Sequence, residues 1–320
     1  MFADLENLTI FTEFLLMDVS SSPELQILQG LIFLVVYLGA LAGNLLTFTV
    51  IVIDPHLHFP MYFFMGNLSL IDFGYISVTV PKSITNCLMG HKVISLRACA
   101  AQTFLFIFFA SGEFFFLVIM SYDRYVAICH PLHYASTVSP RFCTQASCGA
   151  WASGLVYSAV HTGTMFRHPF TKSNVIHQFF CDIPQIMSIS SQSVQFSEFV
   201  ALAVSACIVL LGFVILFASY VHIFSTVLHM HSVDAQNKAL STCSPQIATL
   251  TLFIISGMFA CLGPVSNSSS IQTLLTAMFY SMVSPLVNPI IFSLRNREIK
   301  SAVHRMLKKA FQFHRSNFVS

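Results

Sequence analysis

Long stretches without a charged side chain dominate this sequence. No Asp, Glu, Lys or Arg lies between Glu24 and Asp54, Arg141 and Arg167, Glu198 and Asp234, or Lys238 and Arg295. A helix of roughly 20 apolar residues is long enough to cross the hydrocarbon core of a bilayer. Only 9% of the residues are charged, compared with about 25% in a soluble domain. The sequence therefore predicts a polytopic α-helical membrane protein.

Seven hydrophobic segments can be distinguished between residues 25 and 294. They span residues 25–53, 60–81, 98–122, 142–163, 197–224, 239–262 and 271–294. Polar residues with turn-forming tendency separate them, such as "GPVSNSSS" at 263–270. We therefore predict an all-α membrane protein with a seven-transmembrane helix bundle over residues 25–294. Residues 1–24 and 295–320 are the predicted N-terminal and C-terminal tails.

The positive charges predict the orientation in the plasma membrane, because Lys and Arg are enriched in cytoplasmic segments. The tail contains Arg295, Arg297, Lys300, Arg305, Lys308, Lys309 and Arg315, whereas residues 1–24 contain no Lys or Arg. The tail is therefore predicted to be cytoplasmic and the N-terminus extracellular. The prediction depends mainly on the tail, because five cations would then lie outside, namely Lys82, Lys92, Arg97, Arg167 and Lys172. Asn7 begins a glycosylation sequon and agrees with an extracellular N-terminus.

The first part of the tail has the pattern of a short amphipathic helix over residues 296–311. Its apolar residues at helical spacing are Ile299, Val303, Met306, Leu307 and Phe311, and Lys300, Arg305, Lys308 and Lys309 lie between them. Such a helix lies in the membrane interface and is attracted to anionic lipid. We predict that it follows the seventh span on the cytoplasmic side.

A few polar residues interrupt the apolar segments. Within the spans these are Asn44, Asp72, Glu113 and Asn288, and the pair Asp123–Arg124 ends the third span. A charge at the bilayer centre costs about 2.5–3.5 kcal/mol on insertion scales, so such residues are rare and usually functional. One interpretation is a hydrated polar cluster inside the bundle. The alternative is that these groups only bond neighbouring helices together.

Four motifs in the expected order resemble those of the olfactory receptors, a branch of the rhodopsin-like G-protein-coupled receptors. The motifs are "LHFPMYFFMGNLSLIDF" at 57–73, "MSYDRYVAICHPLHY" at 120–134, "KALSTCSPQI" at 238–247 and "SPLVNPIIFSLRNREIK" at 284–300. The resemblance extends over nearly the whole chain. It implies a seven-helix receptor that binds a small-molecule odorant and a heterotrimeric G protein of the stimulatory olfactory type, which raises cyclic AMP. It implies no cofactor and no catalysed reaction.

The resemblance also implies roles for particular residues. Arg124 would be the switch that engages the G protein, with Asp123 as its partner and Tyr125 completing the motif. Cys99 and Cys181 stand where the family forms a disulfide. The sequence departs from the family at Phe292, where a tyrosine is common, and at Thr171 and Ser191, where relatives commonly have cysteines. We predict that Phe292 affects the stability of the active state, and that the absence of the two cysteines makes the long loop more mobile.

The predicted ligand site lies between the outer halves of the third, fifth, sixth and seventh spans. Its candidate residues are Phe106, Ile107, Ala110, Ser111, Ser205, Gly257, Cys261 and Ser281. None of them is charged, and Phe106 stands where amine receptors of the wider superfamily have an aspartate. An apolar pocket with a few hydroxyl groups cannot compensate for the desolvation of an ion. A small neutral volatile is therefore expected, with Ser111 or Ser205 orienting one oxygen.

Other function classes find less support in the sequence. A secondary transporter would need broken helices in paired positions, but the breaks at Pro285 and Pro289 have no counterpart in the first half. A membrane enzyme would need a catalytic constellation, and no Walker motif or nucleophile elbow is present. The thirteen histidines form no complete tetrahedral metal site. A net charge of +2 gives no indication of nucleic acid binding.

Overall fold

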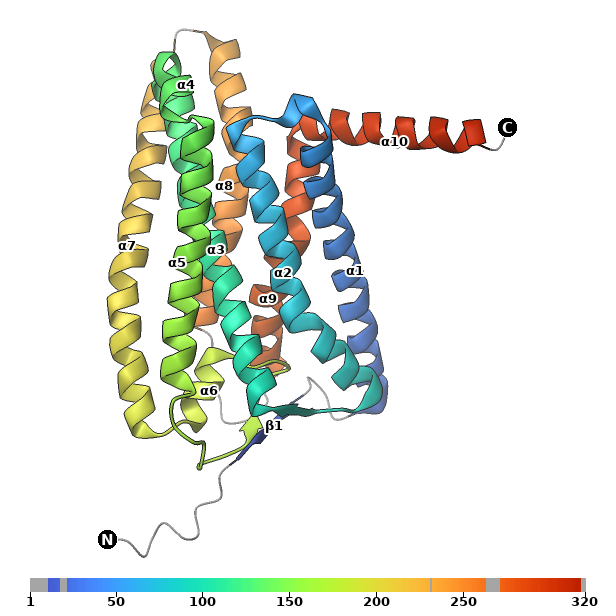
Figure 1. The fold of residues 1–320 in the computed structure, drawn as a ribbon, viewed down its shortest axis with the longest axis vertical. Helices are drawn as coiled ribbons and strands as arrows, with labels where there is room; N and C mark the ends of the chain where they lie inside the picture. The colour runs from blue at the N-terminus through green and yellow to red at the C-terminus, as the bar shows by residue number, and fades with distance from the viewer. Residues whose placement is uncertain (1–10, 18–21, 231, 263–270, 318–320) are drawn as a thin grey trace, which may run out of the picture.

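Seven long helices form the bundle in the computed structural model of the protein, which describes residues 11–17, 22–230, 232–262 and 271–317. They are α1 (Pro23–Ile53), α2 (Pro60–Met89), α3 (Leu96–Cys129), α5 (Pro140–Met165), α7 (Gln192–Leu228), α8 (Val233–Leu262) and α9 (Ile271–Arg295) (Figure 1). The shorter elements at the α10 end are η1 (Pro55–Leu57), η2 (Pro131–His133), α4 (Tyr134–Thr137) and α10 (Arg297–Asn317). At the opposite end, called the sheet end below, are β1 (Glu13–Leu16), β2 (Val93–Ser95), β3 (Val175–Ile176) and α6 (Ile183–Ile189).

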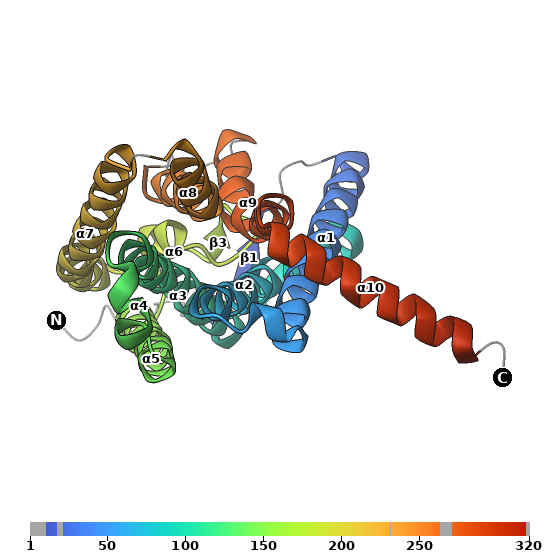
Figure 2. The ribbon, with the colours of Figure 1, turned by 90° about the horizontal axis from the view of Figure 1, so that it is seen from above.

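The outer surface of the bundle is apolar, as a bilayer requires. Val35, Phe199 and Phe217 are among the large hydrophobic side chains that face outward. Within the described residues, six helices are long and apolar enough to cross a membrane, namely α1, α2, α3, α7, α8 and α9. The helix α5 is more polar but runs along the same bundle, beside α3 and α7 (Figure 2). The predicted seven-helix architecture is thus the observed one.

Serine side chains set the starts of several helices. Ser22, Ser95, Ser139 and Ser191 are the N-cap residues of α1, α3, α5 and α7, and each hydroxyl accepts a hydrogen bond from a backbone N–H three residues later. These caps extend the helices beyond the predicted apolar segments. The prediction that the second span ends at residue 81 was wrong, because α2 continues through Pro81 to Met89. In the extra turns Ser83 and Asn86 are buried, whereas Leu88 and Met89 are exposed. The Ser83 hydroxyl shares its hydrogen between the carbonyls of Thr79 and Phe179.

A small sheet covers the end of the bundle opposite α10. The strand β1 lies in its centre, antiparallel to β2 and parallel to β3. The side chains of Phe14 and Leu16 alternate toward the bundle and are fully buried. The sequence predicted only a tail over residues 1–24, so part of that tail is an ordered strand of the core.

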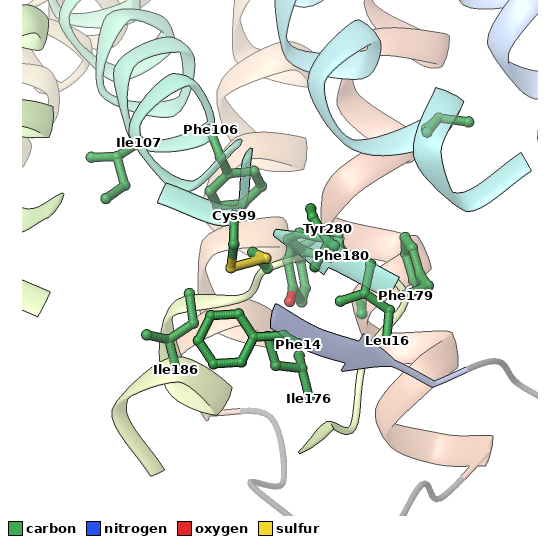
Figure 3. Packing of buried hydrophobic residues seen from close by; sticks show 14 of the residues in the cluster. Phe14, Leu16, Cys99, Phe106, Ile107, Ile176, Phe179, Phe180, Ile186 and Tyr280 are labelled. Carbon is green, nitrogen blue, oxygen red and sulfur yellow. A yellow bond between two sulfur atoms is a disulfide. The ribbon is translucent and has the colours of Figure 1, made fainter. Parts of the chain in front are cut away.

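Aromatic side chains fill the space between this sheet and the helices. Phe106 of α3 packs on Tyr75, Phe180 and Tyr280, with ring centroids 5.0, 5.4 and 6.5 Å away. Figure 3 shows this cluster directly above the strands, with the disulfide of Cys99 at its side. The sheet, the long loop and the helix bundle therefore share one hydrophobic core at this end.

The helix α10 leaves the other end of the bundle at a steep angle (Figures 1 and 2). Ile299 and Ala302 bury its first turns against the bundle. The Arg305 guanidinium donates two hydrogen bonds, of 2.9 and 2.7 Å, to the Asp54 carboxylate in the loop after α1. Burial opposes ionisation of this carboxyl, but the hydrogen bonds from Arg305 and His56 lower the pKa of Asp54 to about 2. This ion pair therefore holds α10 in place throughout the physiological pH range.

Candidate functional site

The pair Asp123–Arg124 lies in the last turns of α3, at the α10 end. The Arg124 Nε donates to Asp123 Oδ2 over 2.9 Å, and both side chains are buried. The Tyr134 hydroxyl of α4 donates to the other carboxylate oxygen, Oδ1, over 2.7 Å. Burial and the Asp123 carboxylate raise the pKa of the Tyr134 phenol, so it remains a donor. Asp123 therefore has partners on both oxygens, and Tyr134 is a third member of this group that the sequence did not single out.

Tyr125, the next residue, points to a different neighbour. Its hydroxyl is 3.0 Å from His130 Nε2, and its ring packs against that of His222 on α7. Near the same end of the bundle is a cavity of about 620 Å³ between α2, α8 and the start of α10. Its lining includes Tyr62, Lys238, Thr242, Pro245, Asn296 and Glu298. Tyr62 interacts electrostatically with Arg124, which is not itself among the lining residues.

Three of the polar residues within the spans meet in the bundle interior. Asn288 Nδ2 donates to Asp72 Oδ2 over 2.9 Å, and Glu113 interacts electrostatically with both residues. All three side chains are buried. Their convergence links α2, α3 and α9 at one level of the bundle.

Asn44 has a separate, structural partner. Its Nδ2 donates to the Pro285 carbonyl over 2.8 Å and to the Ala40 carbonyl of its own helix. Pro289 has no N–H, so the Pro285 carbonyl one turn earlier lacks its normal helical donor. Asn44 supplies that donor from α1, which explains why a buried amide occurs at this position. No direct bond from Asn44 to the Asp72 group is observed among the described residues.

The long loop is tied to α3 by a disulfide between Cys99 and Cys181, whose Cα atoms are 5.6 Å apart. The backbone N–H of Cys181 also donates to Gln102 Oε1 over 2.9 Å. These links hold the loop against the aromatic cluster. The bridge expected from the family motif is thus present.

The candidate ligand residues on α3 do not share one face. Phe106 points into the aromatic cluster, whereas Ile107 projects to the other side of the helix (Figure 3). The Ser111 hydroxyl donates to the Phe108 carbonyl over 3.1 Å and lies against Gly154 of α5. Ala110 is half-buried and packs against the hydrophobic cluster that contains Phe106. The candidate ligand residues of α3 are therefore divided between the aromatic cluster and the contact with α5.

The remaining predicted residues are distributed over α7, α8 and α9. Ser205 and Ser281 are buried, and open space surrounds the position of a side chain at Gly257. Cys261 is in α8, but its side chain lies outside the part that the structure describes, as does Asn7. The sequence missed the two partners near Ser205, His161 of α5 and Glu198 of α7, which are bonded to each other. Glu198 stands next to a long uncharged segment, so from the sequence it is easily taken for an exposed residue at the end of the helix.

The fold is that of the rhodopsin-like seven-helix receptors. The crystal structure of squid rhodopsin superposes with a TM-score of 0.70, covering 92% of this chain and 88% of the rhodopsin chain, at 18% sequence identity. At this identity the likeness establishes the fold alone.

The family follows from sequence comparison. A family model described as "Olfactory receptor" matches residues 33–310. Human olfactory receptor 14I1 is 51% identical and covers 96% of this chain and 99% of its own length. Human olfactory receptor 14C36 is 47% identical, with 95% and 98% covered. The chain belongs to the olfactory receptor family, and it is therefore a multi-pass signalling receptor of the plasma membrane and not an enzyme.

Proposed function

We propose that this receptor binds a small neutral odorant between α3, α7, α8 and α9 and activates a stimulatory olfactory-type G protein, which raises cyclic AMP. The observation that carries the proposal is the buried Asp123–Arg124 pair at the α10 end, where the cavity also lies. Release of Arg124 from Asp123 would present a guanidinium to a partner in that cavity. An odorant that binds better when the pair is released shifts the population toward this signalling state.

The proposal includes an orientation. Residues 295–320 and the α10 end face the cytoplasm, and residues 1–24 with the sheet end face the exterior. Exposed cations on α10, including Arg297, Lys300 and Lys308, favour this orientation, because anionic lipid lies on the cytoplasmic side. The disulfide at the sheet end agrees with it, since disulfides persist in oxidising surroundings.

The charge state of the ligand follows from the residues proposed to contact it. Phe106, Ile107, Ala110, Ser111, Ser205, Gly257, Cys261 and Ser281 have no ionisable group at neutral pH apart from the weakly acidic thiol of Cys261. Glu198, a buried carboxylate that shares His161 as a partner with Ser205, is already bonded to that histidine. An organic cation or anion would lose its hydration without a free counter-charge. A neutral ligand held mostly by apolar burial fits these residues best.

A matched pair of compounds tests the ligand class. We expect a neutral odorant, such as a ketone or alcohol, to raise cyclic AMP in cells that express the receptor, and its permanently charged quaternary ammonium analogue to be inactive at the same concentrations. Cells that express an unrelated odorant receptor serve as the control for toxicity. Equal activation by both members of the pair would show that the pocket compensates an ionic charge and would contradict the proposal.

A further inference from the structure

Packed side chains close the sheet end of the bundle over the aromatic cluster around Phe106. The fully buried side chains of this cover are Phe14, Leu16, Ile176, Phe179 and Phe180 (Figure 3). The ring of Phe14 packs edge-on against Phe170 with centroids 5.1 Å apart, and the disulfide of Cys181 holds the long loop in place. Where the structure describes this end, an odorant arriving from water would have to displace a packed apolar layer.

A groove on the side of the bundle lies between the neighbouring helices α1 and α9, both long and apolar enough to span the membrane (Figure 2). Its volume is about 270 Å³, and every side chain that lines it is hydrophobic. Ile32 of α1 and Leu275 of α9 line it and are 46% and 54% exposed, so the groove opens toward the lipid. Pockets for drug-sized ligands usually measure about 300–1,000 Å³, so this α1–α9 groove has room for a smaller molecule.

Close packing of the two helices ends the α1–α9 groove on the side of the α10 end. A side chain at Gly43 of α1 would meet the ring of Pro289 at 2.9 Å. The Asn44 amide donates to a backbone carbonyl of α9 over 2.8 Å. One turn nearer the sheet end, a side chain at Gly39 would lie 3.5 Å from Leu286, which lines the groove. The floor of the groove is therefore fixed, because α1 and α9 cannot separate there without breaking these contacts.

Two methionine side chains belong to the wall between the groove and the aromatic cluster. Met282 lines the groove, is 4% exposed and is a member of the same hydrophobic cluster as Phe106 and Tyr280. Met278 also lines the groove and packs against that cluster. Methionine is unbranched, has three rotatable bonds and adapts its shape to its neighbours. Rotation of these side chains can therefore admit a small molecule without a movement of α1 or α9.

The chemistry of the groove and its position favour an odorant as the occupant. Lipids that proteins hold specifically are recognised largely by their headgroups, whereas every lining side chain here is hydrophobic. A neutral odorant dissolved in the bilayer has already lost its hydration, and it gains close packing against the walls. An ion would have to lose its hydration without a counter-charge. The groove also borders the cluster of Phe106, a residue of the proposed ligand site.

We propose that neutral odorants dissolved in the bilayer bind in the α1–α9 groove and pass from it, beside Met278 and Met282, to the proposed ligand site at Phe106. This inference rests on the proposed function and deepens it by assigning a membrane-side entry site to the same ligand site. The ligands that can use this entry are molecules that carry no charge and dissolve in hydrocarbon.

Photolabelling of the parent receptor tests the groove directly. The full chain in phosphatidylcholine vesicles is mixed with azioctanol, a diazirine analogue of the neutral odorant 1-octanol, and irradiated at increasing delays. Label on the segments that contain Val36 and Met282 should saturate with probe concentration, and excess 1-octanol should displace it. Label on the segment that contains Phe106 should appear later than label on the groove.

Phe217 of α7 is the internal control for this labelling, because it is 74% exposed on the outer surface of the bundle. Its label should rise in proportion to the probe concentration, as expected for a residue that only meets dissolved probe. Groove label that rises in the same way would show that bulk lipid fills the groove and would overturn the inference. Label that reaches Phe106 before the groove, or that never reaches Phe106, would also overturn it.

A variant that fills the groove tests its role as the route. Val36 is half-buried and lines the groove, so Val36→Trp places an indole inside it. Label on the Phe106 segment should then appear more slowly, by on the order of tenfold, and reach the same final level, because overfilling a packed site raises the barrier to each passage. Val35→Trp is the matched control, since Val35 is the next residue but is 71% exposed.

Ile32→Trp, at the exposed edge of the groove, repeats the test where Val36→Trp does not fold. An unchanged rate in the groove variant that folds would show that odorants enter elsewhere. If the groove fails these tests while neutral odorants raise cyclic AMP in cells, the proposed function stands and this route is wrong. If the groove and then the Phe106 segment are labelled while no odorant raises cyclic AMP, the route stands as a binding path and the proposed function is wrong.

Discussion

Replacing Arg124 with alanine should abolish the odorant-dependent rise in cyclic AMP, while the receptor still reaches the cell surface. The guanidinium is the group proposed to leave Asp123 and enter the cavity at the α10 end, and alanine offers no charge there. Folding should survive, because Tyr134 still donates to the Asp123 carboxylate after the change. The measurement is the cyclic AMP response of cells at matched surface expression.

Arg141→Ala is the control for this experiment. Arg141 is an exposed cation in the first turn of α5, near the same end of the bundle. Its replacement should leave the response close to that of the parent receptor. A normal response by a well-expressed Arg124→Ala variant would remove Arg124 from the proposed mechanism.

Loss of the disulfide should prevent the receptor from reaching the cell surface. The bridge joins residues 82 apart in sequence, and a closed loop of about 80 residues corresponds to roughly 4 kcal/mol of stabilisation in the chain-entropy model. That is a large fraction of the stability of a typical protein. Cys99→Ser and Cys181→Ser should each be retained inside the cell. The double variant should be no worse than either single one, because both remove the same interaction.

Surface labelling of intact cells measures this effect, and Cys207→Ser provides the matched control. Cys207 is an exposed cysteine of α7, and within the described residues its one hydrogen bond is to the Ala203 carbonyl of its own helix. The control should appear at the surface at parental levels. Normal surface levels of the single Cys99 or Cys181 variants would show that the bridge is dispensable, and a double variant worse than both would indicate separate roles for the two cysteines.

The bundle could be predicted from the sequence because its signal is simple. Apolar segments of sufficient length can satisfy their backbone groups in a bilayer only as helices. The sheet could not be predicted, since a strand of four residues such as Glu13–Leu16 acquires its stability from partners far along the chain. The continuation of α2 beyond Pro81 is likewise stabilised by a partner far along the chain. Its buried hydroxyl at Ser83 is satisfied by the loop residue Phe179.

The candidate site also has a part that the sequence predicts and a part that it does not. Asp123 and Arg124 are adjacent in sequence, so a local motif was enough to single them out. The chain His161–Glu198–Ser205 joins two helices and has no local signature, and only Ser205 was selected from the sequence. The division of Phe106, Ile107 and Ser111 between different neighbours depends on where α5 and the long loop pack against α3. Helical spacing alone does not contain that information.

Odorant-stimulated nucleotide exchange by the purified receptor is the most direct test of its proposed role. The full chain would be placed in lipid vesicles with a stimulatory olfactory-type G protein and exposed to a panel of neutral odorants, while uptake of each odorant into the vesicles is followed in parallel. We predict that at least one odorant accelerates exchange, that Arg124→Ala eliminates this acceleration, and that the receptor causes no uptake above that of protein-free vesicles. Receptor-dependent uptake without any acceleration of exchange would contradict the account and indicate a transporter.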